Sequence, residues 1–141
     1  MSRFIKASPT VTQYHYQMHQ WYATSTNDVY IPFGASTSEG TANSNTWIDD
    51  NHWIAPFAGK LVKVYFLCVI AADTCDIKLY VNGSLGSSVL SGGTVEVSST
   101  TVATFTCDQN NTFSLGDKIN LFLINETAPR QSTMTSVWEI D

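Results

Sequence analysis

The chain contains 141 residues, a length that suits one domain rather than two. Charged residues make up 13% of the chain and the formal net charge is −5, while the seven basic residues are scattered singly. This distribution excludes a basic surface for nucleic acid or for an anionic membrane. The longest apolar run, residues 64–72, is much shorter than the ~20 apolar residues of a membrane helix.

Residues 1–10 precede the first periodic segment and place two apolar side chains between two basic ones, namely Arg3, Phe4, Ile5 and Lys6. We predict that this segment is an arm that docks on a partner, either a neighbouring subunit or an acidic patch of a larger particle. A frayed terminus is the alternative. The segment lacks the apolar core of a signal peptide, so we expect the protein to stay in the cytoplasm or to be assembled into a particle there.

The first alternating segment covers residues 11–22, and its period of two predicts a half-buried strand. One face of this strand carries Tyr14, Tyr16 and Met18, and the other carries His15, Gln17 and His19. Residues 29–33 predict a short second strand, which we place at a sheet edge because Pro32 has no N–H for a ladder hydrogen bond. The small polar residues of segment 34–46 are typical of a loop.

The strongest predicted strand covers residues 60–71, which are apolar on both faces. One face carries Val62, Val64, Phe66, Cys68 and Ile70, and the other carries Leu61, Lys63, Tyr65, Leu67 and Val69. A strand that is apolar on both faces must be covered on both, but a sandwich covers only the inner face. We therefore predict that a neighbouring subunit covers the outer face.

Residues 75–81 alternate and are followed by Asn82-Gly83, a strong hairpin signal. Weaker strands are predicted at residues 87–90, 94–97 and 101–107, and a last strand at residues 133–140. A turn at Leu115-Gly116-Asp117 opens the strand 118–125. In that strand Ile119, Leu121 and Leu123 face the core, and Phe122 and Ile124 make the outer face apolar.

No window of helical length shows a 3.6-residue apolar stripe. About eight to ten short strands separated by turn signals predict an all-β fold, a two-sheet antiparallel β-sandwich or jelly roll, in a single domain over residues 11–141. The outer-face apolar residues predict self-association into a homo-oligomer, for which the resemblance described below implies a homotrimer, since they would otherwise form a large exposed patch. The predicted subunit interface consists of Tyr65, Leu67, Val69, Phe122 and Ile124.

Residue types that carry chemistry are present but not in catalytic or metal-binding patterns. His15 and His19 lie about 13 Å apart on a strand, too far to share a metal ion. Asp49 and Asp50 offer oxygen ligands for a weak calcium site, although a turn rich in Asp and Asn is the favoured interpretation. Neither a Gly-x-Ser-x-Gly elbow nor a phosphate-binding loop occurs, so we expect no enzymatic activity, no cofactor and no bound metal.

The three cysteines, Cys68, Cys75 and Cys107, are odd in number and form no C-x-x-C motif. We predict that all three are buried, reduced thiols that react slowly.

Two segments together resemble a known family. Residues 53–61 (WIAPFAGKL) resemble the aromatic-x-Ala-Pro-x-x-Gly-x-Tyr opening of a central strand in complement-type and tumour-necrosis-factor-like jelly rolls, with Leu61 in place of Tyr. Residues 115–121 (LGDKINL) resemble the Leu-x-x-Gly-Asp-x-Val that opens a later strand of these domains. A short, Ser- and Thr-rich chain with this fold and without a collagen stalk is similar to small virion proteins of tailed bacteriophages. The resemblance implies a jelly roll that forms trimers.

The resemblance and the missing chemistry together favour a virion structural protein, a trimeric capsid decoration (cement) protein that stabilises the head lattice. Its expected partners are itself and the major capsid protein or another virion protein, and its expected location is the virion. The alternative is a tail-fibre or spike tip that binds a surface glycan or receptor. That alternative is motivated by Trp21, Trp47 and Trp53, since an exposed aromatic ring can stack on a sugar. Packing in the core is the more frequent fate of so large a side chain.

Overall fold

The computed structural model describes residues 11–21, 29–33, 40–41, 52–68, 74–84, 86–125 and 132–141. In these residues the chain forms strands and no helix, so none is present that is long and apolar enough to cross a membrane. The strands are, in chain order, β1 (Gln13–Trp21), β2 (Val29–Ile31), β3 (Gly40–Thr41), β4 (Trp53–Ile54), β5 (Gly59–Cys68), β6 (Thr74–Val81), β7 (Val95–Glu96), β8 (Ala103–Thr106), β9 (Thr112–Phe113), β10 (Lys118–Asn125) and β11 (Ser132–Ile140).

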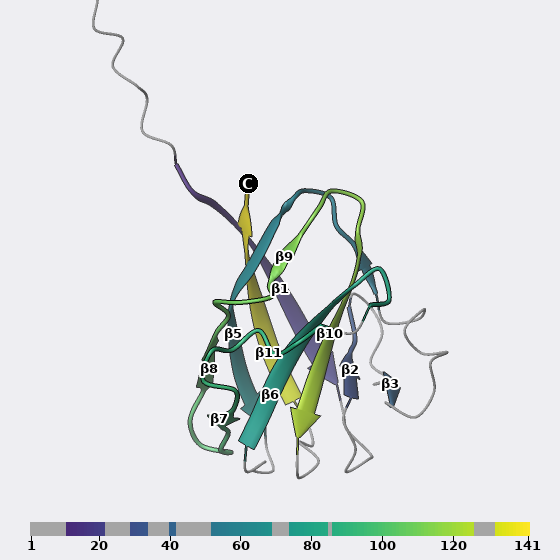
Figure 1. Ribbon diagram of the computed structural model, residues 1–141. Helices are drawn as coiled ribbons and strands as arrows, with labels where there is room; N and C mark the ends of the chain where they lie inside the picture. Colours follow the sequence, from purple (N-terminus) through teal and green to yellow (C-terminus); the bar gives the residue numbers. More distant parts are fainter. Residues whose placement is uncertain are drawn as a thin grey trace, which may run out of the picture.

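The strands form two antiparallel sheets that pack face to face (Figure 1), which confirms the predicted all-β sandwich. The first, which we call the β1 sheet, has the order β1-β11-β5-β8, and β9 also pairs with β5. The second, the β10 sheet, has the order β3-β2-β10-β6-β7, and β4 also pairs with β10.

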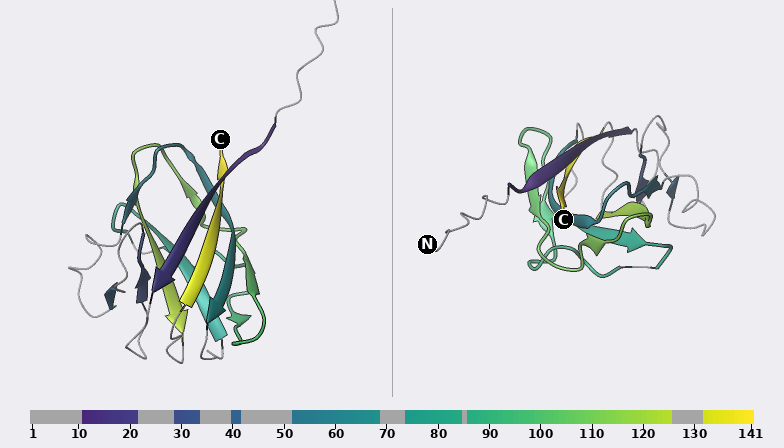
Figure 2. Two further views of the ribbon diagram at one scale, coloured as in Figure 1. Left: turned by 180° about the vertical axis from the view of Figure 1, so that it is seen from behind. Right: turned by 90° about the horizontal axis from the view of Figure 1, so that it is seen from above.

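The strand pairing is nested. The first strand, β1, pairs along its whole length with the last, β11, and β2 pairs with β10. Further inside the sequence, β5 pairs with β8 and β6 pairs with β7. Figure 2 shows β1 (purple) and β11 (yellow) side by side at one edge of the β1 sheet.

The core lies between the sheets and follows the period-two alternation of the longest strands. In β6 and β10 the inward residues Ile77, Leu79, Ile119, Leu121 and Leu123 are all buried, as predicted. They pack against Phe66, Phe105, Met134 and Trp138 of the β1 sheet. Full burial of each such side chain stabilises the fold by ~1.5–3 kcal/mol, so this shared core is the main reason the two sheets stay together.

A β-bulge at Val62 changes the predicted faces of β5. The register between β5 and β11 shifts at this point, because Val137 pairs with Lys63 while Trp138 pairs with Leu61. On the C-terminal side of the bulge the prediction is correct, since Val64, Phe66 and Cys68 are buried and face inward. On its N-terminal side the prediction is wrong, because the extra residue reverses the alternation and turns Leu61 into the core.

The face of β1 that carries the histidines is the one that faces the core. His19 and Trp21 are buried and His15 and Gln17 are partly buried, whereas the tyrosines and Met18 lie on the solvent side. The strand prediction is confirmed, and the more polar face is the inner one. The reason is a hydrogen-bond network that His19 makes with the other strands, described below.

Turns and edges are partly as predicted. Asn82 and Gly83 form a tight turn with positive φ angles of 53° and 78°, closed by a 3.1 Å hydrogen bond from the Ser84 N–H to the Val81 carbonyl. The edge position predicted for the second strand is wrong, because β2 pairs with both β10 and β3. Pro32 follows the last residue of β2, so the ladder needs no N–H from it. The strand predicted at residues 87–90 is only an isolated bridge at Ser88.

Candidate binding face on the β1 sheet

The structure places the predicted interface residues on opposite sides of the sandwich. Tyr65 and Leu67 lie on the outer face of β5, in the β1 sheet, and both are exposed. Phe122 and Ile124 lie on the outer face of β10, in the other sheet. These four residues therefore do not form one surface within a protomer. Val69 and the predicted arm residues Arg3, Phe4, Ile5 and Lys6 lie outside the described residues, as do Asp49 and Asp50.

On the outer face of the β10 sheet, Phe122 is covered by side chains of the neighbouring strands. Phe122 is only 6% exposed, because Tyr30 and Tyr80 pack against it with ring centroids at 4.8 and 5.5 Å. Tyr30 is the direct cross-strand partner of Phe122, and Tyr80 is a diagonal neighbour on β6. Ile124 packs against this cluster. Phe122 therefore offers little apolar surface to a second subunit.

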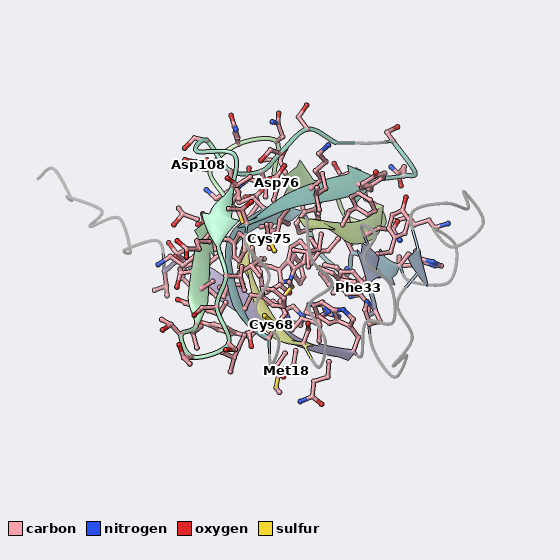
Figure 3. The ribbon with its side chains drawn as sticks, turned by 90° about the horizontal axis from the view of Figure 1, so that it is seen from below. Met18, Phe33, Cys68, Cys75, Asp76 and Asp108 are labelled. Carbon is pink, nitrogen blue, oxygen red and sulfur yellow. The ribbon has the colours of Figure 1, made fainter. Side chains whose placement is uncertain are left out.

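The outer face of the β1 sheet, in contrast, leaves large apolar side chains in solvent. Tyr14, Tyr16 and Met18 of β1 are 47%, 63% and 67% exposed. Figure 3 shows Met18 pointing away from the molecule. Tyr65, Leu67 and Val102 extend the exposed apolar surface across the sheet to the start of β8. The strand register places these residues on one face, since Tyr16 is level with Val137 and Lys63, and Met18 is level with Thr135 and Tyr65.

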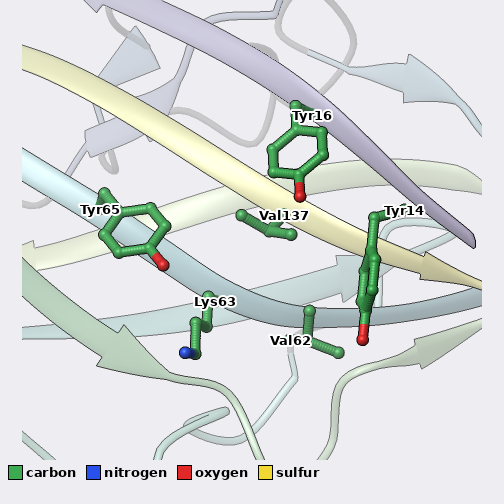
Figure 4. A pocket seen from close by; sticks show the side chains of 6 residues that line it. All are labelled: Tyr14, Tyr16, Val62, Lys63, Tyr65 and Val137. Carbon is green, nitrogen blue, oxygen red and sulfur yellow. The ribbon is translucent and has the colours of Figure 1, made fainter. Parts of the chain in front are cut away.

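Two shallow hollows lie on this face. The first has a volume of about 250 Å³ and is lined by Tyr14, Tyr16, Val62, Lys63, Tyr65 and Val137; we call it the tyrosine hollow. Figure 4 shows the three tyrosine rings arranged around Val137, with the Lys63 side chain between Tyr65 and Val62. The second, of about 200 Å³, is lined by Tyr65, Leu67, Val102, Thr133 and Thr135 together with the buried Phe66 and Met134; we call it the lower hollow.

The charges on this face leave one ammonium group free. Lys60 forms an ion pair with Glu139, with 3.0 Å between Nζ and Oε1. Lys63 is exposed and has no ion-pair partner among the residues that the structure describes. The tyrosine hollow therefore combines exposed aromatic rings with an uncompensated positive charge, in a protein whose net charge is negative.

The sequence did not single out Tyr14 and Tyr16 as surface residues, and it left the tryptophans open between core packing, their more frequent fate, and exposure at a glycan site. Trp21 is buried and stacks on Phe66 with ring centroids 5.8 Å apart. Trp53 is partly buried against the core and lies 5.2 Å from Trp138, while Trp47 is outside the described residues. The available signal was the alternation of β1, which separates the tyrosines from the histidines, but periodicity alone does not say which face is inside.

His19 is a buried structural residue. Its Nδ1 lies 2.9 Å from the Pro32 carbonyl oxygen, which can only accept, so Nδ1 carries the proton. Nε2 then accepts from the Ser136 hydroxyl at 2.8 Å, and the Ser136 oxygen accepts from Trp138 Nε1 at 2.9 Å. Burial lowers the pKa of His19 to about 4, against the smaller opposing effect of the Pro32 hydrogen bond.

A serine hydroxyl beside a histidine resembles a nucleophile with its base. However, Ser136 is fully buried and His19 is 2% exposed, so no substrate atom can approach the hydroxyl oxygen in this conformation. The arrangement instead joins β1 and β11 of one sheet to the end of β2 in the other.

His15 and the three cysteines also have structural environments. His15 stacks on Trp53 with ring centroids 5.7 Å apart. No group of three potential metal-ligating side chains occurs in the described part of the chain. Cys68, Cys75 and Cys107 are buried, as predicted, and none of them forms a disulfide; Figure 3 shows Cys68 and Cys75 in the interior. Burial is the main cause that raises the pKa values of Cys75 and Cys107 to about 12.

No protein-family model matches this chain, and no curated protein matches it at a significant level.

Proposed function

We propose that the protein is a non-enzymatic structural protein of a virion, a capsid decoration protein that assembles as a homotrimer and stabilises the head lattice. The nested strand pairing supports this proposal, because pairing the first strand with the last and the second with the next to last is what two Greek keys of a jelly roll require. The strand-opening motifs at residues 53–61 and 115–121 point to the same family.

The observation that carries the proposal is the exposed apolar surface around the lower hollow. Met18, Tyr65, Leu67 and Val102 are all more than one third exposed and share one sheet face. Exposed apolar patches of this kind mark protein interfaces in soluble proteins. The proposed self-contact therefore uses Tyr65 and Leu67, adds Met18 and Val102, and does not depend on Phe122, which its neighbours already cover.

The test is the mass of the native protein in solution, measured by light scattering coupled to size exclusion. A protomer has a mass of 15.5 kDa, and we expect three times that value. Leu67→Asp should give monomers, because a carboxylate buried in an apolar contact without a partner is strongly unfavourable. Leu115→Asp is the matched control, since Leu115 is equally apolar and 69% exposed but lies in a turn away from this face. A wild-type protein that remains monomeric at micromolar concentration refutes the trimer.

The virion assignment has its own test, which is the copy number in purified particles. Quantitative mass spectrometry should find the protein at hundreds of copies, in a fixed ratio to the major capsid protein, its proposed partner. A handful of copies contradicts decoration and supports the fibre-tip alternative.

A second candidate function is the binding of a surface glycan. The specific observation in its favour is the tyrosine hollow, where three partly exposed rings from β1 and β5 surround a shallow depression. Aromatic rings with one apolar face and one polar end are suited to contacts with a sugar.

A further inference from the structure

The tyrosine hollow has the size and lining of a site for one small polar ring. Its volume of about 250 Å³ lies below the ~300–1,000 Å³ of sites for drug-sized ligands, so it suits a single ring rather than a long ligand. Val137, only 6% exposed, forms its floor, and the rings of Tyr14, Tyr16 and Tyr65 form its rim (Figure 4). The rim thus offers apolar ring faces and three hydroxyl groups to the same ligand.

Charge makes the choice among small polar rings more specific. Among the residues that the structure describes, Lys63 contributes the one ammonium group that lines the hollow. The nearest carboxylate along the strand register, Glu139 opposite Tyr14, is held by Lys60 in an ion pair. A ligand that brings its own carboxylate would pair with Lys63, whereas a neutral ligand would leave this charge uncompensated.

We propose that the tyrosine hollow binds an acidic sugar residue of a glycan, a uronic-acid type of ring. The apolar face of the sugar packs on the tyrosine rings, its carboxylate pairs with the Lys63 ammonium group, and its hydroxyl groups exchange hydrogen bonds with the tyrosine hydroxyls. This inference rests on the second candidate function, glycan binding, and it shares Tyr65 with the proposed trimer contact.

The hollow and the proposed self-contact occupy different parts of the same face. The tyrosine hollow lies around Val137, in the half of the sheet near the C-terminal end of β11. The lower hollow lies around Leu67 and Val102, and Tyr65 lines both. A trimer that covers Leu67 and Val102 would therefore leave Tyr14, Tyr16 and Lys63 available, and it would present several hollows to one polysaccharide.

The experiment is a titration of the full-length ¹⁵N-labelled protein, followed by amide chemical shifts. The probes are tetragalacturonic acid, maltotetraose as the neutral counterpart and tetraglutamate as a carboxylate without sugar rings. We expect tetragalacturonic acid to shift the amides of β1, β5 and β11 near the hollow, with a Kd on the order of 1 mM for a site of this size. Maltotetraose should bind at least tenfold more weakly, and tetraglutamate should not bind to this face.

Two variants separate the roles of ring and charge. Tyr16→Ala should weaken tetragalacturonic acid binding at least tenfold, while Lys63→Gln should remove the preference for the acidic over the neutral probe. Leu115→Ala is the control variant and should bind as the wild type does. Tyr16 is 63% exposed, so its variant should retain the thermal unfolding midpoint, which checks that any loss of binding is local.

The outcomes distinguish failure of the acidic-sugar site from failure of glycan binding, the candidate function on which it rests. Equal binding of the neutral and acidic tetrasaccharides overturns the acidic assignment and leaves glycan binding in place. Binding of tetraglutamate as tight as that of tetragalacturonic acid overturns the role of the rings. Absence of binding by both tetrasaccharides overturns the acidic site and counts against glycan binding as well.

Discussion

The hydrogen-bond network around His19 gives the sharpest stability prediction, which concerns Ser136→Ala. The Ser136 hydroxyl donates to His19 Nε2 and accepts from Trp138 Nε1, and all three side chains are buried. Removing the hydroxyl leaves two buried polar atoms without these partners. A site with no exposed surface also leaves little room for water to replace the hydroxyl.

The expected loss follows from those two atoms. An unsatisfied buried donor or acceptor costs about 1–3 kcal/mol, so Ser136→Ala should lower the free energy of unfolding by roughly 2–6 kcal/mol. This is a large fraction of the ~5–15 kcal/mol that typically separates folded from unfolded domains. His19→Phe should cost less in the Ser136→Ala background than in the wild type, because Nε2 has already lost its Ser136 partner there, while the Pro32 carbonyl loses its donor in both. The double variant should therefore be less destabilised than the sum of the single ones, with a coupling of about 1 kcal/mol or more.

The assay is urea unfolding of the four proteins of this cycle, followed by tryptophan fluorescence. Thr133→Ala provides the matched control, since Thr133 lies on the same strand but is exposed, and its change should stay within ~0.5 kcal/mol. A Ser136→Ala variant as stable as this control would refute the reasoning. Strict additivity of the two changes would show that His19 and Ser136 do not act as one network.

Four further predictions concern other parts of the molecule. The free energy of unfolding should fall by roughly 3 kcal/mol as the pH drops from 6.5 to 4, since unfolded His19 takes up its proton near pH 6.5 and the folded residue only near pH 4; His19→Phe should flatten this dependence in pH-resolved urea unfolding. A polar thiol reagent should label the cysteines only in urea, and fast native labelling of Cys68 would contradict its burial. In urea unfolding, Gly59→Ala should lower the free energy of unfolding by ~1–3 kcal/mol, because an added Cβ would overlap the Glu139 carbonyl oxygen. Gly92→Ala should leave it unchanged, because a Cβ at this position would point into open space. Deleting residues 1–9 should leave the β-sheet circular dichroism intact but weaken trimers or capsid binding, and full decoration by the truncated protein would exclude a docking arm.

The elements that sequence predicted well are those whose signal is local. β6 alternates apolar and polar residues from Cys75 to Leu79, so the inward positions of Ile77 and Leu79 follow from period two alone. The turn at Asn82-Gly83 was equally predictable, because positive φ angles at two successive positions favour this residue pair.

The elements that sequence did not predict depend on distant partners. The bulge at Val62 is a property of the pairing between β5 and β11 and leaves no trace in the apolar pattern of residues 60–71. On the inward face of β1, His19 finds its hydrogen-bond partner in Ser136, which is 117 residues away in the sequence. Which outer-face residues share a surface depends on the sheet to which each strand belongs, so Tyr65 and Phe122 look equivalent in sequence and lie on opposite sides of the sandwich.

Aromatic side chains are covered on the outer face of the β10 sheet and exposed on the outer face of the β1 sheet, and the central strands explain this difference. On the β10 sheet the large ring belongs to the central strand, so Phe122 is reached by Tyr30 from one neighbour and by Tyr80 from the other. On the β1 sheet the rings belong to β1 and β5, and the strand between them, β11, presents the smaller Thr133, Thr135 and Val137. Small side chains between two rows of large ones leave hollows that the rings do not close, and both observed hollows include residues of β11. A face left open in this way gains stability only when something else fills it, which is why we assign the contacts of this protein to the β1 sheet.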